Sequence, residues 1–211
     1  MTARWGPMGW MTLHSISVCY PETPAPEDKL ITKQFIERFI ECITCPNCRG
    51  HIHRMFDTYQ RIHPDWANSR YDLFLMMCRL HNSVNKRLDK PRPATVKECL
   101  DMLRTATSVT SPATFRHNYI HYVINNWAFD SSGEGFMMKG AAREMNRINI
   151  EYWNRRETSY IGLEFPEANV LEEISEGTDH YKVGNGITPF NPSVVRTGFR
   201  LQAGRLSLGR R

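Results

Sequence analysis

Residues 71–88 read YDLFLMMCRLHNSVNKRL, and this stretch is the most informative part of the sequence for predicting the fold. Its first half is almost wholly apolar, which predicts a helix near the centre of the molecule. Four side chains then share one face of that helix, at positions i, i+3, i+4 and i+7: Cys78, His81, Asn82 and Asn85. Buried polar groups that lack partners cost about 1–3 kcal/mol each. The pattern therefore predicts that something polar lies against this stripe.

The segments around this helix also have helical patterns. Helices are predicted before it over 6–20, 27–42 and 46–59, and a short one is predicted after it from a cap at Thr95. Two more helical patterns follow, FRHNYIHYVINNWAF at 115–129 and FMMKGAAREMNRINIEYWNRR at 136–156. The predicted fold class is all-α: a four-helix bundle with a short fifth helix, then an additional helical region and a basic tail. The bundle with its fifth helix is predicted over 1–108, the additional helical region over 109–157 and the irregular, partly disordered basic tail over 158–211.

Composition places the chain among ordinary globular proteins, with 41% hydrophobic and 23% charged residues in 211. No run approaches the roughly 18–20 apolar residues of a membrane span, and no signal or transit peptide is expected. The net charge of +5 comes from the end of the chain, where six basic and no acidic residues follow Asp179. Nucleic acid is therefore not an expected partner of the near-neutral body. The tail, whose residues 182–211 are predicted to be disordered, could touch nucleic acid, a membrane surface or an acidic partner, or be merely solvated.

All six cysteines lie in the first 99 residues, and three of them fall in CITCPNCRGH, residues 42–51. Proline is favourable at the first position of a helix, so Pro46 places Cys45 at the cap and Cys48 in the first turn. The positive end of a helix stabilises a thiolate, which suits a reversible disulfide.

Zinc is the alternative for this stretch, with four candidate ligands: Cys42, Cys45, Cys48 and His51. Cysteines at i, i+3 and i+6 of one helix would struggle to surround an ion tetrahedrally. No separate C-x2-C outside this stretch is present to complete an ordinary finger. A redox disulfide is therefore the favoured interpretation, and no metal ligand is expected.

Three blocks together resemble the Erv/ALR family of FAD-dependent sulfhydryl oxidases: WGPMGWMTLHSISVCYPETP, CPNCRGH and CRLHNSVNKRLDKP. The resemblance covers roughly residues 5–106 and is closest to the branch found in large cytoplasmic DNA viruses. It implies a helical bundle that holds FAD, and a homodimer. It also implies the cofactor-binding residues, which are Trp10, His14, Cys78, His81, Asn82, Val84, Asn85, Lys86 and Lys90.

The resemblance further implies a thiol oxidase mechanism. A substrate thiolate attacks Cys45, a second thiol releases the mixed disulfide, and Cys48 passes the electron pair to FAD, with O2 as the final acceptor and hydrogen peroxide as product. Because no second C-x-x-C lies near either terminus to act as a shuttle, a protein dithiol, such as one on a thioredoxin-like carrier, must reach Cys45 directly. By analogy, the expected locations are the viral assembly sites of the host cytoplasm and the virion.

Several alternatives stay open at this point. Cys78 and Cys99 could form a structural disulfide, as the resemblance suggests, or be two reduced core cysteines. Cys42 and Cys19 are expected to pack in the interior rather than to exchange disulfides. The rival function is a zinc-stabilised helical module with a tail that contacts nucleic acid, and a third is a flavin-bearing scaffold without turnover.

Overall fold

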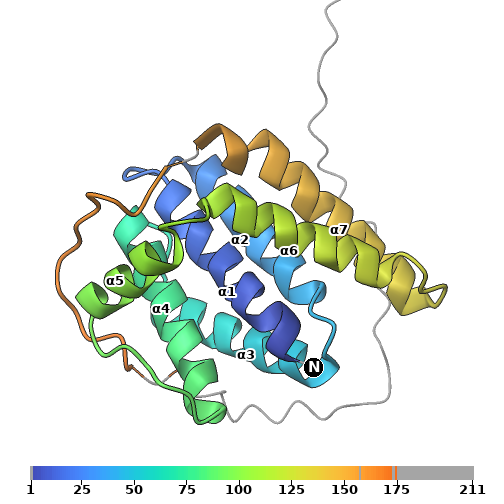
Figure 1. The fold of residues 1–211 in the computed structure, drawn as a ribbon, viewed down its shortest axis with the longest axis horizontal. Coiled ribbons are helices and arrows are strands. Elements are labelled where there is room, and N and C mark those ends of the chain that lie inside the picture. Colours follow the sequence, from blue (N-terminus) through green and yellow to red (C-terminus); the bar gives the residue numbers. More distant parts are fainter. Residues whose placement is uncertain (1, 157, 173, 175–211) are drawn as a thin grey trace, which may run out of the picture. The chain divides into compact units, whose positions relative to one another are not determined.

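The computed structural model describes residues 2–156, 158–172 and 174, and these residues form an α-helical molecule (Figure 1). The all-α prediction is confirmed: the described part of the chain contains helices, one isolated β-bridge between Thr95 and Asn169, and no strand. The helices are α1 (Thr2–Cys19), α2 (Pro26–Glu41), α3 (Pro46–Ile62), α4 (Arg70–Arg87), α5 (Val96–Ala106), α6 (Pro112–Trp127), α7 (Gly133–Glu151) and the 3-10 turn η1 (Trp153–Arg156).

Local chemistry explains where these helices begin. Hydroxyl side chains cap four of them by accepting a hydrogen bond from a backbone N–H of the first turn, at Ser69, Thr95, Ser111 and Ser132. Proline occupies the first turn of α2, α3 and α6, where its missing N–H needs no partner. The cap expected at Thr95, before α5, is thus confirmed.

Helix α1 lies at the centre and is covered from two sides. Residues 12–20 are all buried, which is unusual for a helix of a small bundle. Close contacts join α1 to α4 on one side and to α6 on the other, and Figure 1 shows α6 crossing beside it. Gly9 permits part of this approach, because a Cβ there would stand only 3.1 Å from a ring atom of Phe39 and 3.2 Å from one of Tyr119.

The α6–α7 pair also packs against α2. The fully buried Trp153, just after α7, makes an edge-on contact with Phe35 of α2 at a ring-centroid distance of 5.8 Å. The guanidinium of Arg116 is buried among side chains of α1, α7 and η1. It donates hydrogen bonds to Ser15 Oγ (3.3 Å), Asn149 Oδ1 (2.8 Å) and Asn154 Oδ1 (3.3 Å). The second helical region therefore shares one core with the first.

The chain then returns across the bundle as an irregular segment, residues 158–172 and 174, here called the strap. Tyr160 and Val170 are fully buried, and Phe165 packs on the ring of Phe74 at 4.9 Å. Backbone bonds tie it to the start of α5, from Val170 N–H to the Ala94 carbonyl (3.0 Å) and from Val96 N–H to the Ala168 carbonyl (3.1 Å). The predicted irregular structure is present here, but its close packing was not foreseen. The basic residues of the predicted tail lie outside the described residues.

Candidate active site

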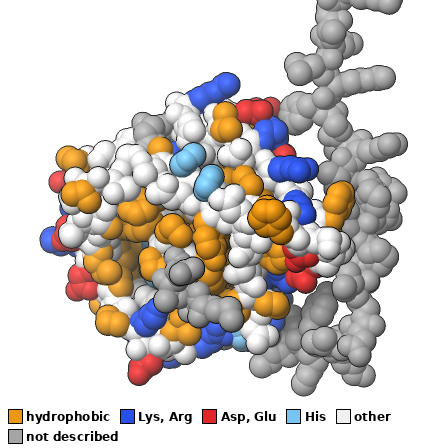
Figure 2. All heavy atoms as spheres, turned by 45° about the vertical axis from the view of Figure 1, so that its right-hand side comes forward, with side chains coloured by type: hydrophobic (Ala, Val, Ile, Leu, Met, Phe, Trp, Pro, Cys, Tyr) orange, Lys and Arg blue, Asp and Glu red, His pale blue; other side chains and the backbone are white. Residues whose placement is uncertain are grey.

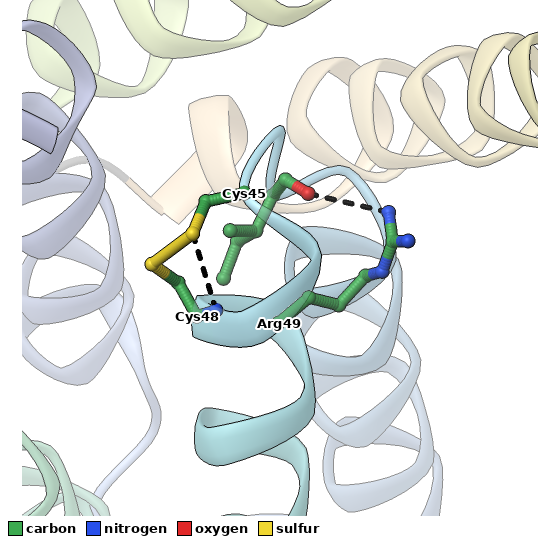
Figure 3. Close-up of a disulfide and its surroundings, with 4 residues drawn as sticks. Cys45, Cys48 and Arg49 are labelled. Carbon is green, nitrogen blue, oxygen red and sulfur yellow. Dashed lines mark hydrogen bonds between the residues drawn. A yellow bond between two sulfur atoms is a disulfide. The ribbon is translucent and has the colours of Figure 1, made fainter. Parts of the chain in front are cut away.

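Cys45 and Cys48 form a disulfide at the first turn of α3 (Figure 3). Cys45 is the N-cap of α3, and its Cα lies 5.2 Å from that of Cys48. The Cys48 backbone N–H donates a hydrogen bond to Cys45 Sγ over 3.3 Å. Both cysteines are half-buried, whereas Pro46 and Asn47 between them are exposed. This geometry favours negative charge on Cys45 Sγ and leaves the pair within reach of solvent.

Arg49 holds the segment that leads into the redox pair. Its guanidinium donates to the Ile43 carbonyl (3.3 Å), and Figure 3 shows it on the opposite side of α3 from the disulfide. It also forms an ion pair with Glu134 of α7 at 2.5 Å. Arg49 was not singled out from the sequence, and nothing local to its position signals these partners.

Cys42, one turn before the redox pair, is fully buried. Its thiol donates to the Met138 carbonyl over 3.8 Å. Burial, followed by the charge of Glu41, raises the pKa of Cys42 to about 12. Cys42 is therefore a thiol and not a thiolate at neutral pH, which confirms the expected packing role.

A second cluster joins α1 to α4. The ring of Trp10 stacks on His81 at a centroid distance of 4.2 Å and an interplanar angle of 10°. His14 Nε2 lies 3.0 Å from His81 Nδ1, so one ring donates a hydrogen bond to the other. The family resemblance assigned all three residues to the cofactor site, and the structure brings them together.

Both histidines are neutral at pH 7. Burial lowers the pKa of His14, and His81 lowers it further. Burial and then the nearby charge of Lys90 lower the pKa of His81 to about 4. His14 Nδ1 is buried and has no hydrogen-bond partner in the described structure. A buried, unpaired nitrogen beside stacked neutral rings suits a flat aromatic ligand with a polar edge.

The remaining predicted site residues continue along α4. Asn82 is buried, and its amide donates to the carbonyls of Pro93 (2.9 Å) and Val170 (2.9 Å). Asn85 donates to the Pro91 carbonyl over 3.2 Å. The polar partners of these two side chains are therefore backbone carbonyls. Val84 is half-buried, and the other two residues of the set are exposed at the end of the helix, Lys86 and Lys90.

A cavity of about 80 Å³ opens between this end of α4 and the strap. Its lining is Asn82, Ser83, Lys86, Arg92, Leu171, Glu172 and Ile174. Two of the predicted site residues thus border it. The strap residues of the lining were missed in the sequence, because they follow no periodic pattern.

Cys78 and Cys99 are both buried, and neither forms a disulfide. Cys19 is buried as well. Burial and then the neighbouring Cys99 thiol raise the pKa of Cys78. Of the two possibilities for Cys78 and Cys99, the structure shows reduced core cysteines close to each other. The packing role expected for Cys19 is confirmed.

The zinc alternative has no observation in its favour, since the described residues contain no group of three or more His, Cys, Asp or Glu side chains that could hold a metal ion. None of the described helices combines the length and apolar character that crossing a membrane requires.

Comparison with known proteins agrees with this geometry. Residues 7–106 match the model of the Erv1 / Alr family. The FAD-linked sulfhydryl oxidase of African swine fever virus (isolate Tick/Malawi/Lil 20-1/1983) is 36% identical over 87 residues, which are 41% of this chain and 70% of that protein. The chain belongs to the Erv1 / Alr family. The family resemblance read from the sequence is thus confirmed.

Two further relatives of this Erv1 / Alr member come from a yeast and from an invertebrate virus. The mitochondrial FAD-linked sulfhydryl oxidase ERV1 of Saccharomyces cerevisiae is 36% identical over 87 residues, 41% of this chain and 44% of that protein. The putative FAD-linked sulfhydryl oxidase 096R of Invertebrate iridescent virus 3 is 34% identical over 91 residues, 43% of this chain and 60% of that protein.

Proposed function

We propose that this chain is an FAD-linked sulfhydryl oxidase that forms disulfide bonds in protein dithiols. The observation that carries the proposal is the Cys45–Cys48 disulfide at the start of α3, in a member of the Erv1 / Alr family. Its relatives from African swine fever virus and yeast bear the name FAD-linked sulfhydryl oxidase.

The redox pair acts by thiol–disulfide exchange. A substrate thiolate attacks Cys45 Sγ, a substrate–Cys45 disulfide forms, and Cys48 leaves as a thiolate. The second thiolate of the substrate then attacks the substrate sulfur that is bonded to Cys45 Sγ. This closes the substrate disulfide, and Cys45 leaves as a thiolate. The Cys48 N–H stabilises charge on Cys45 Sγ as it leaves. The pair is now a dithiol carrying two electrons and the substrate protons.

The other candidate site residues fit FAD. Trp10 and His81 offer stacked rings, the unpaired Nδ1 of His14 offers one polar contact, and Lys86 and Lys90 are cations for the phosphates. We assign cofactor contacts to these residues and to Cys78, Asn82, Val84 and Asn85. FAD held there would supply a two-electron acceptor for the dithiol, with O2 as the final acceptor and hydrogen peroxide as the product.

The finer parts of the proposal rest on the resemblance. They are the homodimer, a thioredoxin-like carrier as substrate, a viral origin, and location in the host cytoplasm and the virion. Within the chain we assign the chemistry to residues 1–108, and packing support to 109–157 and the described part of 158–211. Light scattering of the purified protein tests the homodimer.

The direct test is a visible spectrum and oxygen uptake with dithiothreitol, for the parent and for Cys48→Ser. The parent should be yellow and consume oxygen, and Cys48→Ser should keep the flavin band and lose the uptake. Cys42→Ser is the matched control, because it removes a nearby buried thiol outside the exchange sequence. A colourless parent, or uptake that is indifferent to Cys48, would overturn the proposal.

A further inference from the structure

The two cysteines of the redox pair lie in backbone of different kinds. Cys48 belongs to the first turn of α3, whereas Cys45 is the last residue of a short non-helical segment between α2 and α3, residues 42–45, here called the link. In the oxidised pair the S–S bond ties the end of the link to α3. Reduction breaks this bond. The contacts that the link makes elsewhere then decide how closely Cys45 stays beside Cys48.

Side chains of α3 and α6 and a carbonyl of α7 hold the link at its first two residues. The guanidinium of Arg49 donates to the Ile43 carbonyl over 3.3 Å (Figure 3). Trp127, at the end of α6, donates its indole N–H to the Cys42 carbonyl over 3.3 Å. The Cys42 thiol donates to the Met138 carbonyl of α7 over 3.8 Å. Two of these three contacts come from helices that follow the matched part of the chain.

Arg49 joins the link to α7 by a further contact. One of its terminal nitrogens, Nη2, forms the ion pair with Glu134 in the first turn of α7 at 2.5 Å. The other, Nη1, faces the carbonyls of Glu41 (3.5 Å) and Ile43. Only 21% of the Arg49 side chain is exposed, so these partners replace most of its water contacts. The ion pair therefore orients the guanidinium toward the backbone at the start of the link.

We propose that Arg49 is a positioning residue for the redox reaction, because it fixes the link against α7 and keeps Cys45 Sγ beside Cys48 Sγ after the disulfide has opened. This inference rests on the proposed oxidase function and extends it to α6 and α7, which lie outside the matched residues 7–106. A link that is already ordered loses little conformational entropy when the dithiol closes again. The contacts thus favour the disulfide over the dithiol, and their loss makes the pair easier to reduce.

The reduction potential of the redox pair tests the proposal. The FAD-loaded full chain is equilibrated without oxygen in mixtures of reduced and oxidised glutathione. Two reduced glutathiones supply the two electrons and two protons that convert the disulfide to a dithiol, and they become one oxidised glutathione. Alkylation and mass spectrometry then count the thiols of Cys45 and Cys48. In Arg49→Gln the equilibrium constant for disulfide closure should fall about tenfold, which raises the potential of this two-electron couple by about 30 mV.

Two other variants separate positioning from a general effect on the fold. Arg38→Gln is the matched control, since Arg38 is 29% exposed and pairs with the Glu41 carboxylate on its own helix rather than with the link. It should leave the potential unchanged. Glu134→Gln keeps the size of an exposed side chain and removes the charge that orients Arg49, so it should raise the potential by a smaller amount. Thermal melts accompany each variant, because a merely structural residue would lower the melting temperature without moving the potential.

The outcomes that oppose the proposal are distinct from failure of the oxidase function. A parent-like potential in Arg49→Gln would overturn it, and so would an equal rise in Arg38→Gln. If Arg49→Gln does not fold, Glu134→Gln decides, and an unchanged potential there would overturn the proposal. A parent without Cys48-dependent oxygen uptake would instead sink the oxidase function, while the potential, measured without oxygen, still reports on positioning.

Discussion

Two regions of the molecule differ in what they contribute. The first region is residues 7–106, which match the family model, and the second region runs from α6 to the strap. The first region holds the redox pair and the Trp10–His14–His81 cluster. The second region holds no cysteine, yet it covers α1 and α2 and its strap reaches α4 and α5. The African swine fever virus relative is 70% covered by 87 matched residues, so it is too short to repeat the whole second region. In this chain the core therefore extends beyond the residues that match the family.

The largest effect should come from removing the second region. A chain that ends at Ser108 exposes the face of α1 that α6 covers, including the contact of Gly9 with Tyr119. We expect it to lose the cooperative melting of a monomer and to aggregate or self-associate. Circular dichroism melts and light scattering measure this, with a chain ending at Gly177, the edge of the compact unit, as control. A cooperative monomer with the parent melting temperature would show that the two regions have separate cores.

A single substitution in the second region also tests whether the two regions share one core, with a smaller expected effect than the truncation. Trp153→Ala removes a fully buried ring that packs on Phe35 of α2. Loss of a large buried aromatic side chain costs about 3–5 kcal/mol of unfolding free energy. Urea denaturation measures it, and Phe129→Ala at a solvent-exposed position should change the free energy by less than about 0.5 kcal/mol. A cost below about 1 kcal/mol for Trp153→Ala would contradict a shared core.

The two regions should also respond differently to acid. Among the described residues of the second region, the buried charged side chain is Arg116 and no histidine is buried. In the first region His81 is half-buried, and its pKa of about 4 lies below the unfolded value of about 6.5. The unfolded chain therefore binds more protons between these values, so stability is complete above pH 6.5 and falls as the pH drops toward 4.

The free energy of unfolding should fall by on the order of 2–3 kcal/mol as His81 becomes protonated in the unfolded chain. Thermal unfolding of the flavin-free protein between pH 7 and 4.5 measures it. His81→Gln should flatten this slope, because the new side chain does not titrate, whereas His53→Gln at the surface should leave it steep. An unchanged slope in His81→Gln would place the acid sensitivity elsewhere.

The parts that could be predicted from the sequence are those set by local chemistry. Ser69 and Thr95 cap their helices because the hydroxyl bonds an N–H three residues later, and the redox pair follows from Pro46 in a first turn. The prediction that something polar lies against the stripe on α4 is confirmed. His81 meets the ring of His14, and Asn82 donates to backbone carbonyls of Pro93 and Val170. Such partners carry no residue-type signal, so the strap could not be foreseen from composition or periodicity.

The smallest effect concerns the link between the strap and the catalytic region. The hydroxyl of Tyr160 donates to the His14 carbonyl over 2.6 Å, and these residues are 146 positions apart in the chain. Tyr160→Phe keeps the ring buried and removes this bond, so the unfolding free energy should fall by about 1 kcal/mol. Tyr122→Phe on α6 is the matched control and should have a smaller effect in the same urea titration.

Because the bond lies on the backbone of a residue assigned to FAD, flavin should also dissociate faster from Tyr160→Phe, which dilution fluorescence measures. Unchanged stability and unchanged flavin release would show that the strap covers the bundle without fixing α1.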